Sequence, residues 1–507
     1  MSADLFFGEA GHRWRVVSGY EAYVRKVLAA GARAPEELPG ARVVKHNRVR
    51  TVVRVPEGPS GALFVKRFRA HGLAKQLVHT LRGSPAAREF RAMRALAASG
   101  VPCPEPVVLG EERRAGRVVG SVLATREVSG CEELAERTQR ARRDREATVR
   151  RRLAEALARA AWSLFAAGVE HPDMHPGNFL IDPSGALVVL DLHSAAVRGG
   201  ALGARRRRRL LGKLAWGLGP PFGDRYRDFY EELGWFCAEY ARLDPALGGA
   251  DDLRAGLLAD ALALEAVRLR SREKRCLVES STFAVTRSPR GRLYRRREAP
   301  AAEVRAALDG ADERAVVAGI VVERVHAAAG LRRDPLLRAW KLARACEVRG
   351  VATRCAFALE RRGGFCGGES VLLLAAADGP SLPEALRAAG PARRRELLRE
   401  AGALVGRLHA GGLGHADLRG DALRVSSGGV YLAALEGVRH EAAPAVDALR
   451  WFAALPLSGH ERLRFWRAYA RAGGWRPWAA PGEDERAVRA RLLHDLLEEG
   501  PTAGPRP

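Results

Sequence analysis

The sequence predicts an α+β fold made of two consecutive domains, each with a small β-rich lobe followed by a larger helical lobe. Three observations support this. Short β-like runs occupy residues 41–68, helical segments fill most of residues 205–272, and the second half of the chain repeats this outline. A chain of 507 residues is too long for one compact core, and a repeat of about 245 residues indicates a duplicated domain. We expect domains at 1–275 and 276–495, a flexible tail at 496–507 and a junction near 272–280.

Local signals set the order of elements in the first half. Ser84 caps a helix that has Pro85 at its first position and that stops near Gly100. The remaining expected elements are β-like runs at 43–44, 51–55 and 62–66, a strand at 120–125, an alanine-rich helix at 147–168 and a hydrophobic strand at 186–190.

The formal charge of +25 comes almost entirely from arginine, since lysine is rare. Together with abundant Ala and Gly, this indicates a coding bias, with much of the charge dispersed and solvated. The alternative is a surface that meets anionic lipid, phosphorylated sugar or nucleic acid. Because no nucleic-acid-binding module is recognisable, we expect no specific nucleic-acid partner.

The cysteines and the N-terminus bear on the compartment. The seven cysteines show neither a CxxC pair nor a zinc-like spacing, which fits a reducing cytosol. The N-terminus lacks the basic start and apolar core of a signal peptide, and no stretch reaches the roughly 18 apolar residues that span a bilayer. We expect a cytoplasmic protein that is soluble or at most peripheral to a membrane.

The strongest motif is HxDxxxxN, formed by His171, Asp173 and Asn178. Phosphoryl transfer from ATP needs an acceptor hydroxyl to be oriented and the phosphate charge to be neutralised by Mg²⁺. Asp173 can accept the proton of the attacking hydroxyl, and the amide oxygen of Asn178 can bind the metal ion. Asp191 follows a hydrophobic strand and opens the sequence Asp-Leu-His, where it would chelate the same ion. This pattern predicts a catalytic centre within residues 171–191.

Lys66 is the expected phosphate-binding lysine, because Lys is kept here in a chain whose usual base is Arg. Glu89, placed in the first turn of the next helix, is its expected partner, although acids favour a first helical turn in any case. No GxGxxG loop is present. The matching stretch is the polar, basic segment 45–51, so no phosphate-binding residue is assigned there.

Two further segments carry weaker signals. Glu127 and Val128 follow a strand where a hinge between lobes belongs, so their backbone groups could bind adenine; an ordinary strand exit is equally compatible with the sequence. Arg205, Arg206 and Arg207 begin a run of five arginines, which is either a solvated helix surface or a clamp for anionic groups on the acceptor.

The second half preserves Asp417 in His-Ala-Asp but loses the other motif residues. Ala422 stands where the Asn belongs, and Ala434 (or Ala433, on a one-residue shift) stands where the metal-binding Asp belongs. We expect Arg295 or Arg296 in place of the strand lysine and Ala339 or Trp340 in place of the helix Glu. Because the charge neutralisation needed for transfer would be missing, we expect a degenerate, non-catalytic partner domain.

These residues resemble the lipopolysaccharide-core sugar kinase family (heptose and Kdo kinases), a branch of the protein-kinase-like fold. The likeness runs from about Val43 to Arg198 and includes Val-Lys-Arg-Phe at 65–68, Ser-Pro-Ala-Ala-Arg-Glu at 84–89 and Asp-Leu-His at 191–193. The segment His-Pro-Gly-Asn at 175–178 also resembles aminoglycoside and choline phosphotransferases. A single-domain sugar kinase lacks the second domain present here.

The resemblance implies a bilobal kinase-like fold for the first domain, and the internal repeat extends this expectation to tandem domains with a degenerate second copy. It implies ATP and Mg²⁺ as cofactors and an anionic glycolipid or sugar hydroxyl as acceptor, at the cytoplasmic face of an inner membrane. It carries kinase roles onto Lys66, Glu89, Asp173, Asn178 and Asp191. The alternatives are a protein kinase, a small-molecule phosphotransferase and a non-catalytic kinase-fold scaffold. The oligomeric state stays open.

Overall fold

The computed structural model describes residues 4–219, 226–288, 291–329, 334–364, 367–418, 422–440, 452, 455–475 and 485–498. Contacts divide the chain into two compact units. Unit 1 is Met1–Gly219 with Asp228–Ala261, and unit 2 is Pro220–Arg227 with Leu262–Pro507. The division falls inside helix α9 (Ala250–Glu273), before the expected junction. In the described part of the chain, no helix is both long and apolar enough to cross a membrane.

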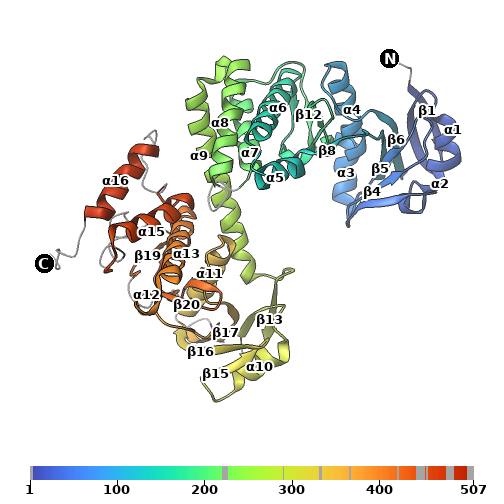
Figure 1. The fold of residues 1–507 in the computed structure, drawn as a ribbon. Coiled ribbons are helices and arrows are strands. Elements are labelled where there is room, and N and C mark those ends of the chain that lie inside the picture. Colours follow the sequence, from blue (N-terminus) through green and yellow to red (C-terminus); the bar gives the residue numbers. More distant parts are fainter. Residues whose placement is uncertain are drawn as a thin grey trace. The chain divides into compact units, whose positions relative to one another are not determined.

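Unit 1 begins with an antiparallel sheet in the order β1-β2-β6-β7-β5-β4-β3 (Figure 1). Two strands that the sequence did not signal, β1 and β2, form its first hairpin, and the helical segment over residues 21–31 covers a core built on Trp14, Tyr20 and Val107. The strands are β1 (Asp4–Glu9), β2 (His12–Val17), β3 (Arg42–His46), β4 (Arg50–Val55), β5 (Leu63–Arg69), β6 (Pro106–Arg114) and β7 (Arg117–Arg126).

Two helices connect β5 to β6: α3 (Leu73–Arg82) and α4 (Pro85–Ala98). The expected cap of α4 is confirmed, since Ser84 Oγ accepts from the Ala87 N–H at 3.1 Å. The second lobe is mostly helical, and short strands hold its loops. Its elements are β8 (Glu132–Glu133), α5 (Leu134–Arg143), α6 (Ala147–Ala166), β9 (Val169–Glu170), β10 (Phe179–Ile181), β11 (Leu187–Val189), β12 (Ala196–Val197), α7 (Ala204–Gly217) and α8 (Tyr226–Leu243).

Unit 2 has a six-stranded sheet in the order β13-β14-β17-β18-β16-β15, which matches the order β1-β2-β6-β7-β5-β4 of unit 1. Its sheet strands and the helices beside them are β13 (Phe283–Ser288), β14 (Gly291–Arg296), α10 (Ala301–Asp309), β15 (Arg314–Val317), β16 (Ile320–Ala329), α11 (Pro335–Val348), β17 (Ala356–Gly364) and β18 (Gly367–Ala375). Its helical part contains α12 (Leu382–Ala388), α13 (Pro391–Ala410), β19 (Gly414–His415), β20 (Leu423–Ser426), β21 (Gly429–Leu432), β22 (Val438–Arg439), α15 (Gly459–Arg471) and α16 (Glu485–Glu498).

Candidate active site

Lys66 and Glu89 form an ion pair, with Lys66 Nζ 2.5 Å from Glu89 Oε1. Lys66 lies on β5, and the side chain of Glu89 is fully buried on α4. Helix α4 begins at Pro85, so Glu89 lies in the second turn and not in the first turn expected from the sequence. A buried carboxylate is costly without a counter-charge, so the helix dipole does not explain Glu89, whereas its pairing with Lys66 does.

The loop from His171 to Asn178 is held by its own hydrogen bonds. The Asn178 side-chain amide donates to the Asp173 carbonyl oxygen at 2.7 Å, and the Asn178 N–H donates to the His175 carbonyl oxygen at 2.9 Å. Since Asn178 Nδ2 is used in this way, the side-chain oxygen is the atom left for a ligand. Burial lowers the pKa of His171, so its ring, 3.4 Å from the Leu190 carbonyl oxygen, stays neutral.

Asp173 lies at the surface of this loop. Its side chain is exposed, and within the described residues its carboxylate makes no hydrogen bond or ion pair. The carboxylate is therefore free to meet an incoming hydroxyl.

Asp191 follows β11 and connects the loop to the sheet. The Leu190 N–H donates to the Asn178 carbonyl oxygen at 2.8 Å, and this bond keeps Asp191 and Asn178 beside each other. Asp191 adopts a left-handed backbone conformation with φ of 58°, which Asp tolerates better than most residues. Its Oδ1 lies 2.6 Å from Arg50 Nη1 and 2.8 Å from His193 Nδ1.

The charge state of Asp191 is set by opposing effects. Burial alone would raise the pKa of its carboxyl group. The hydrogen bond from His193, the charge of Lys66 and the hydrogen bond from Arg50 outweigh burial and hold the pKa well below its ordinary value. Asp191 is therefore an anion at neutral pH. Arg50, on β4, is a site residue that sequence analysis did not assign.

These donors fit a magnesium ion. A carboxylate and an amide oxygen, from Asp191 and Asn178, are the ligands that Mg²⁺ takes while it keeps several waters. Ligand atoms of Glu89, Asp191 and His193 also lie within 4.8 Å of one another, but Glu89 is already paired with Lys66. The residues that would hold the ion are therefore Asn178 and Asp191.

A pocket of about 720 Å³ opens at these residues. Asp173, Asn178 and Asp191 line it from the helical lobe, and Lys45 and Arg50 line it from the sheet. Its other lining residues include Asn47 and Val49 from the turn between β3 and β4, and Lys75, Val78 and His79 from α3. The structure thus brings segments that are far apart in the sequence to one cleft.

The proposed adenine-binding residues lie just after β7. The Glu127 side chain is held by two hydrogen bonds of 2.7 Å from Arg54, and these, with the charge of Arg54, lower its pKa. The Glu127 N–H donates to the Ala62 carbonyl oxygen at 2.9 Å. Neither Glu127 nor Val128 lines the 720 Å³ pocket, and adenine binding there stays a prediction.

The arginine run lies on α7. Arg206 is 4.0 Å from Glu170 and Arg207 is 2.9 Å from Asp244. Arg205 and Arg206 are both exposed. The residues lining the cleft include none of these arginines. Their proposed role as an acceptor clamp stays a prediction.

The registers in which the strands of each sheet pair show which unit 2 residue stands at the position of Lys66. Lys66 pairs with Leu123 on β7, and in unit 2 Val325 pairs with Leu372 on β18. Val325 therefore takes the place of the strand lysine. The expectation of Arg295 or Arg296 was wrong, because both lie on β14, the counterpart of β2.

The unit 2 positions that correspond to Glu89, Asn178 and Asp191 are the ones expected from the sequence. Helix α11 starts at Pro335 after the cap Asp334, as α4 starts at Pro85 after Ser84, so Ala339 takes the place of Glu89. The Ala433 N–H donates to the Ala422 carbonyl oxygen at 2.8 Å, as Leu190 does to Asn178. Ala422 and Ala434 therefore stand at the positions of Asn178 and Asp191.

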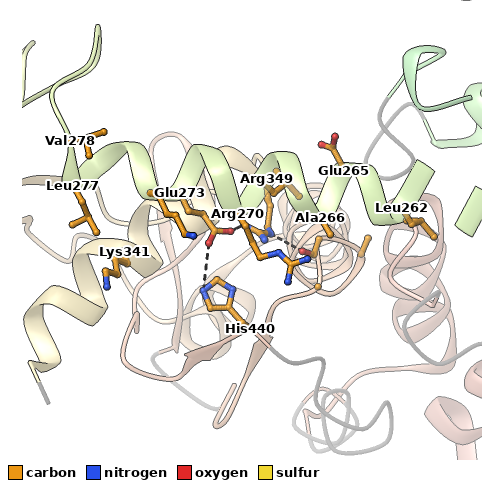
Figure 2. Close-up of a pocket in the computed structure, with 15 residues that line it drawn as sticks. Leu262, Glu265, Ala266, Arg270, Glu273, Leu277, Val278, Lys341, Arg349 and His440 are labelled. Atoms are coloured by element: carbon orange, nitrogen blue, oxygen red, sulfur yellow. Dashed lines mark hydrogen bonds and ion pairs between the residues drawn. The ribbon is translucent and has the colours of Figure 1, made fainter. Parts of the chain in front are cut away.

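Unit 2 has a pocket of about 790 Å³ of its own, shown in Figure 2. Helix α9 supplies one wall, with Leu262, Ala266 and Glu273. The Glu273 carboxylate pairs with Arg349 at 2.5 Å and lies 3.7 Å from His440. None of the positions that correspond to the unit 1 site lines this pocket.

The sheet with its buried lysine–glutamate pair, the HxDxxxxN loop and the aspartate after the next strand define an α+β kinase-like fold. Within that class, residues 42–215 match the sequence model of the lipopolysaccharide kinase (Kdo/WaaP) family. The chain is 31% identical over 166 residues to a 3-deoxy-D-manno-octulosonic acid kinase of Stenotrophomonas maltophilia (strain K279a). That alignment covers 31% of this chain and 64% of the relative, slightly less than two thirds of the relative's length.

Two solved structures were also matched. WaaP in complex with acyl carrier protein is 26% identical, with 44% of this chain and 88% of that chain covered and a TM-score of 0.33. A rhoptry antigen kinase domain specific to Toxoplasma gondii is 13% identical, with 43% and 73% covered and a TM-score of 0.27. Because both scores are low, the fold is assigned from the strands and helices of this chain itself.

Proposed function

We propose that unit 1 transfers the γ-phosphate of ATP to a sugar hydroxyl, in the lipopolysaccharide core or a related glycolipid. The observation that carries the proposal is one cleft lined by Asp173, Asn178 and Asp191, with the buried Lys66–Glu89 pair beside Asp191. The matched relative is named as a kinase of a sugar acid, which favours a sugar as the acceptor.

Each residue has a distinct proposed role. Lys66, oriented by Glu89, binds the α- and β-phosphates. Asp173 accepts the proton of the attacking hydroxyl, and its exposed carboxylate suits that role. Asn178 and Asp191 would hold Mg²⁺, which neutralises phosphate charge during transfer. Backbone groups of Glu127 and Val128 bind adenine, and Arg205, Arg206 and Arg207 contact anionic groups of the acceptor.

Arg50 adds a role that follows from its contact. It pairs with Asp191 at 2.6 Å. If Asp191 held Mg²⁺, the Arg50 guanidinium would be free to bind the phosphates at the mouth of the cleft. In this way the basic segment 45–51 substitutes for a glycine-rich loop.

For unit 2 we propose a degenerate kinase-like domain that binds or regulates and does not catalyse. Val325 and Ala339 replace the ion pair, and Ala422 and Ala434 replace the metal ligands. Asp417 remains, but without metal ligands beside it no Mg²⁺ would be held there to neutralise the phosphate charge.

Nucleotide binding tests the site independently of the acceptor. Mg·ATP should raise the melting temperature of the full chain, because a ligand that binds only the folded state stabilises it. Asp191→Ala should remove the shift, and Asp312→Ala, at an exposed position of unit 2, should retain it. A shift that survives Asp191→Ala would place nucleotide elsewhere.

An acceptor comparison tests the reaction. Phosphate should enter lipid A–core oligosaccharide and should not enter a generic protein or an aminoglycoside. Transfer to the protein or to the aminoglycoside instead would assign this cleft to a protein kinase or a small-molecule phosphotransferase.

A further inference from the structure

Helix α3 turns its polar side toward the sheet and its apolar side outward. Thr80 Oγ1 accepts from the Val118 N–H on β7 at 3.0 Å and donates to the Gln76 carbonyl oxygen at 2.7 Å. Leu73, Leu77 and Leu81, each four residues apart, are 62%, 51% and 84% exposed. A surface helix normally has the opposite orientation. We name Leu73, Leu77, Val78 and Leu81 the α3 face.

In the described part of the chain nothing covers this face, since α3 has no buried residue. More exposed apolar side chains lie nearby, on β3 and in the turn that follows. The ring of His71 contacts the Arg48 carbonyl oxygen at 2.7 Å and ties that turn to the start of α3. The added residues are Val43, Val44 and Val49. An exposed apolar surface of this kind marks an interaction site.

The surroundings of the α3 face are strongly basic. Residues 42–82 contain ten arginines and lysines and a single acidic residue, Glu57. Lys75 and Arg82 are exposed on α3 itself. An apolar helix face with cations around it is the pattern of helices that lie in the surface of an anionic bilayer, with the apolar side among the acyl chains.

The α3 face adjoins the catalytic cleft. Val78 belongs both to the face and to the lining of the cleft, and Val49, in the turn after β3, also lines the cleft. Unit 2 has no room for such a helix, because only residues 330–334 separate β16 from α11, where residues 70–84 separate β5 from α4 in unit 1. The helix thus accompanies the intact site and is not a general feature of the repeat.

We propose that the α3 face docks on an anionic phospholipid bilayer and holds the mouth of the cleft at the level of the lipid headgroups. A glycolipid acceptor would then present its sugar to Asp173 without leaving the membrane. The docking proposal rests on the proposed function for the reason that the cleft should face a membrane, namely a glycolipid acceptor. The vesicle-binding test does not require catalysis.

Sedimentation with vesicles tests the docking. Without nucleotide, the full chain should bind vesicles of phosphatidylglycerol and phosphatidylethanolamine at least about tenfold more tightly than phosphatidylcholine vesicles, and the binding should weaken as salt rises. Leu77→Glu/Leu81→Glu should weaken binding to the anionic vesicles at least about tenfold. Val267→Glu, at a position 61% exposed on α9, should bind as the original chain does.

Three results would contradict docking of the α3 face on a bilayer. Vesicle binding that the double variant retains, or no vesicle binding by the original chain, would overturn the proposal. So would a dimer in sedimentation equilibrium that only the double variant dissociates, since the occupant would then be a second copy. Phosphorylation of a soluble core oligosaccharide should be unchanged in the double variant. Failure of the original chain in that assay would count against the proposed function and not against the docking.

Discussion

Arg50 and Asp191, separated by 141 residues in sequence, form an ion pair of 2.6 Å across the catalytic cleft. The pair places a strand cation on the carboxylate that we propose as a metal ligand. Arg50 and His193 both contact Oδ1 of this carboxylate, so Arg50 would compete with a cation for it.

Removal of the competing cation should strengthen metal binding. Arg50→Gln should lower the Mg²⁺ concentration that gives half of the ATP-dependent thermal shift by about fivefold, equivalent to roughly 1 kcal/mol for a partly exposed pair. Arg25→Gln, which breaks the exposed pair with Glu9, should leave that concentration unchanged. A higher Mg²⁺ requirement in Arg50→Gln would show that Arg50 assists metal binding.

The Lys66–Glu89 pair should contribute to folding as well as to catalysis. Lys66→Met leaves a fully buried carboxylate without its counter-charge, which should cost about 3 kcal/mol of unfolding free energy. Adding Glu89→Gln should recover most of that loss, because the buried charge is then gone. Denaturant unfolding of both variants measures this, with Lys26→Met, at an exposed lysine, as control. A double variant no more stable than Lys66→Met would refute the coupling.

Sequence analysis identified the pair and the loop because each carries a local signal: a rare lysine on a strand, and residues at fixed spacing. It could not find Arg50, whose contact with Asp191 depends on the packing of distant segments. It also misplaced the lysine position of unit 2. Arg295 and Arg296 are basic residues in a strand, as Lys66 is, and only the register of Val325 with Leu372 identifies the correct strand.

Strand β1 and the orientation of α3 were beyond local patterns for a related reason. Leu5, Phe6 and Phe7 on β1 are consecutive apolar residues, so β1 lacks the regular alternation that marks a half-buried strand. Helix α3 has clear helical periodicity, but periodicity cannot tell which side faces the sheet. Thr80 decides it through its hydrogen bond with Val118.

Unit 2 should lose stability in mild acid through His409. Burial lowers the pKa of His409 to about 3, below its ordinary value of 6.5. The unfolded chain therefore binds a proton between pH 6.5 and about 3 that the folded chain does not. The stabilisation is complete above pH 6.5 and declines as the pH falls, by about 1.4 kcal/mol per pH unit from this group.

His409→Gln should reduce the slope of unfolding free energy against pH between 6 and 4. His326→Gln, at an exposed histidine paired with Glu369, should change the slope much less. Equal slopes in the original chain and His409→Gln would mean that His409 becomes protonated without unfolding.

The most direct test of the division between the two units is transfer of radiolabelled γ-phosphate from ATP to lipid A–core oligosaccharide by three forms of the full chain. Asp173→Ala should lose about 10³-fold in turnover, as expected for removal of a catalytic base, and Asp417→Ala should stay within about twofold of the original chain. Turnover that survives Asp173→Ala but is lost in Asp417→Ala would show instead that the working catalytic centre lies in unit 2.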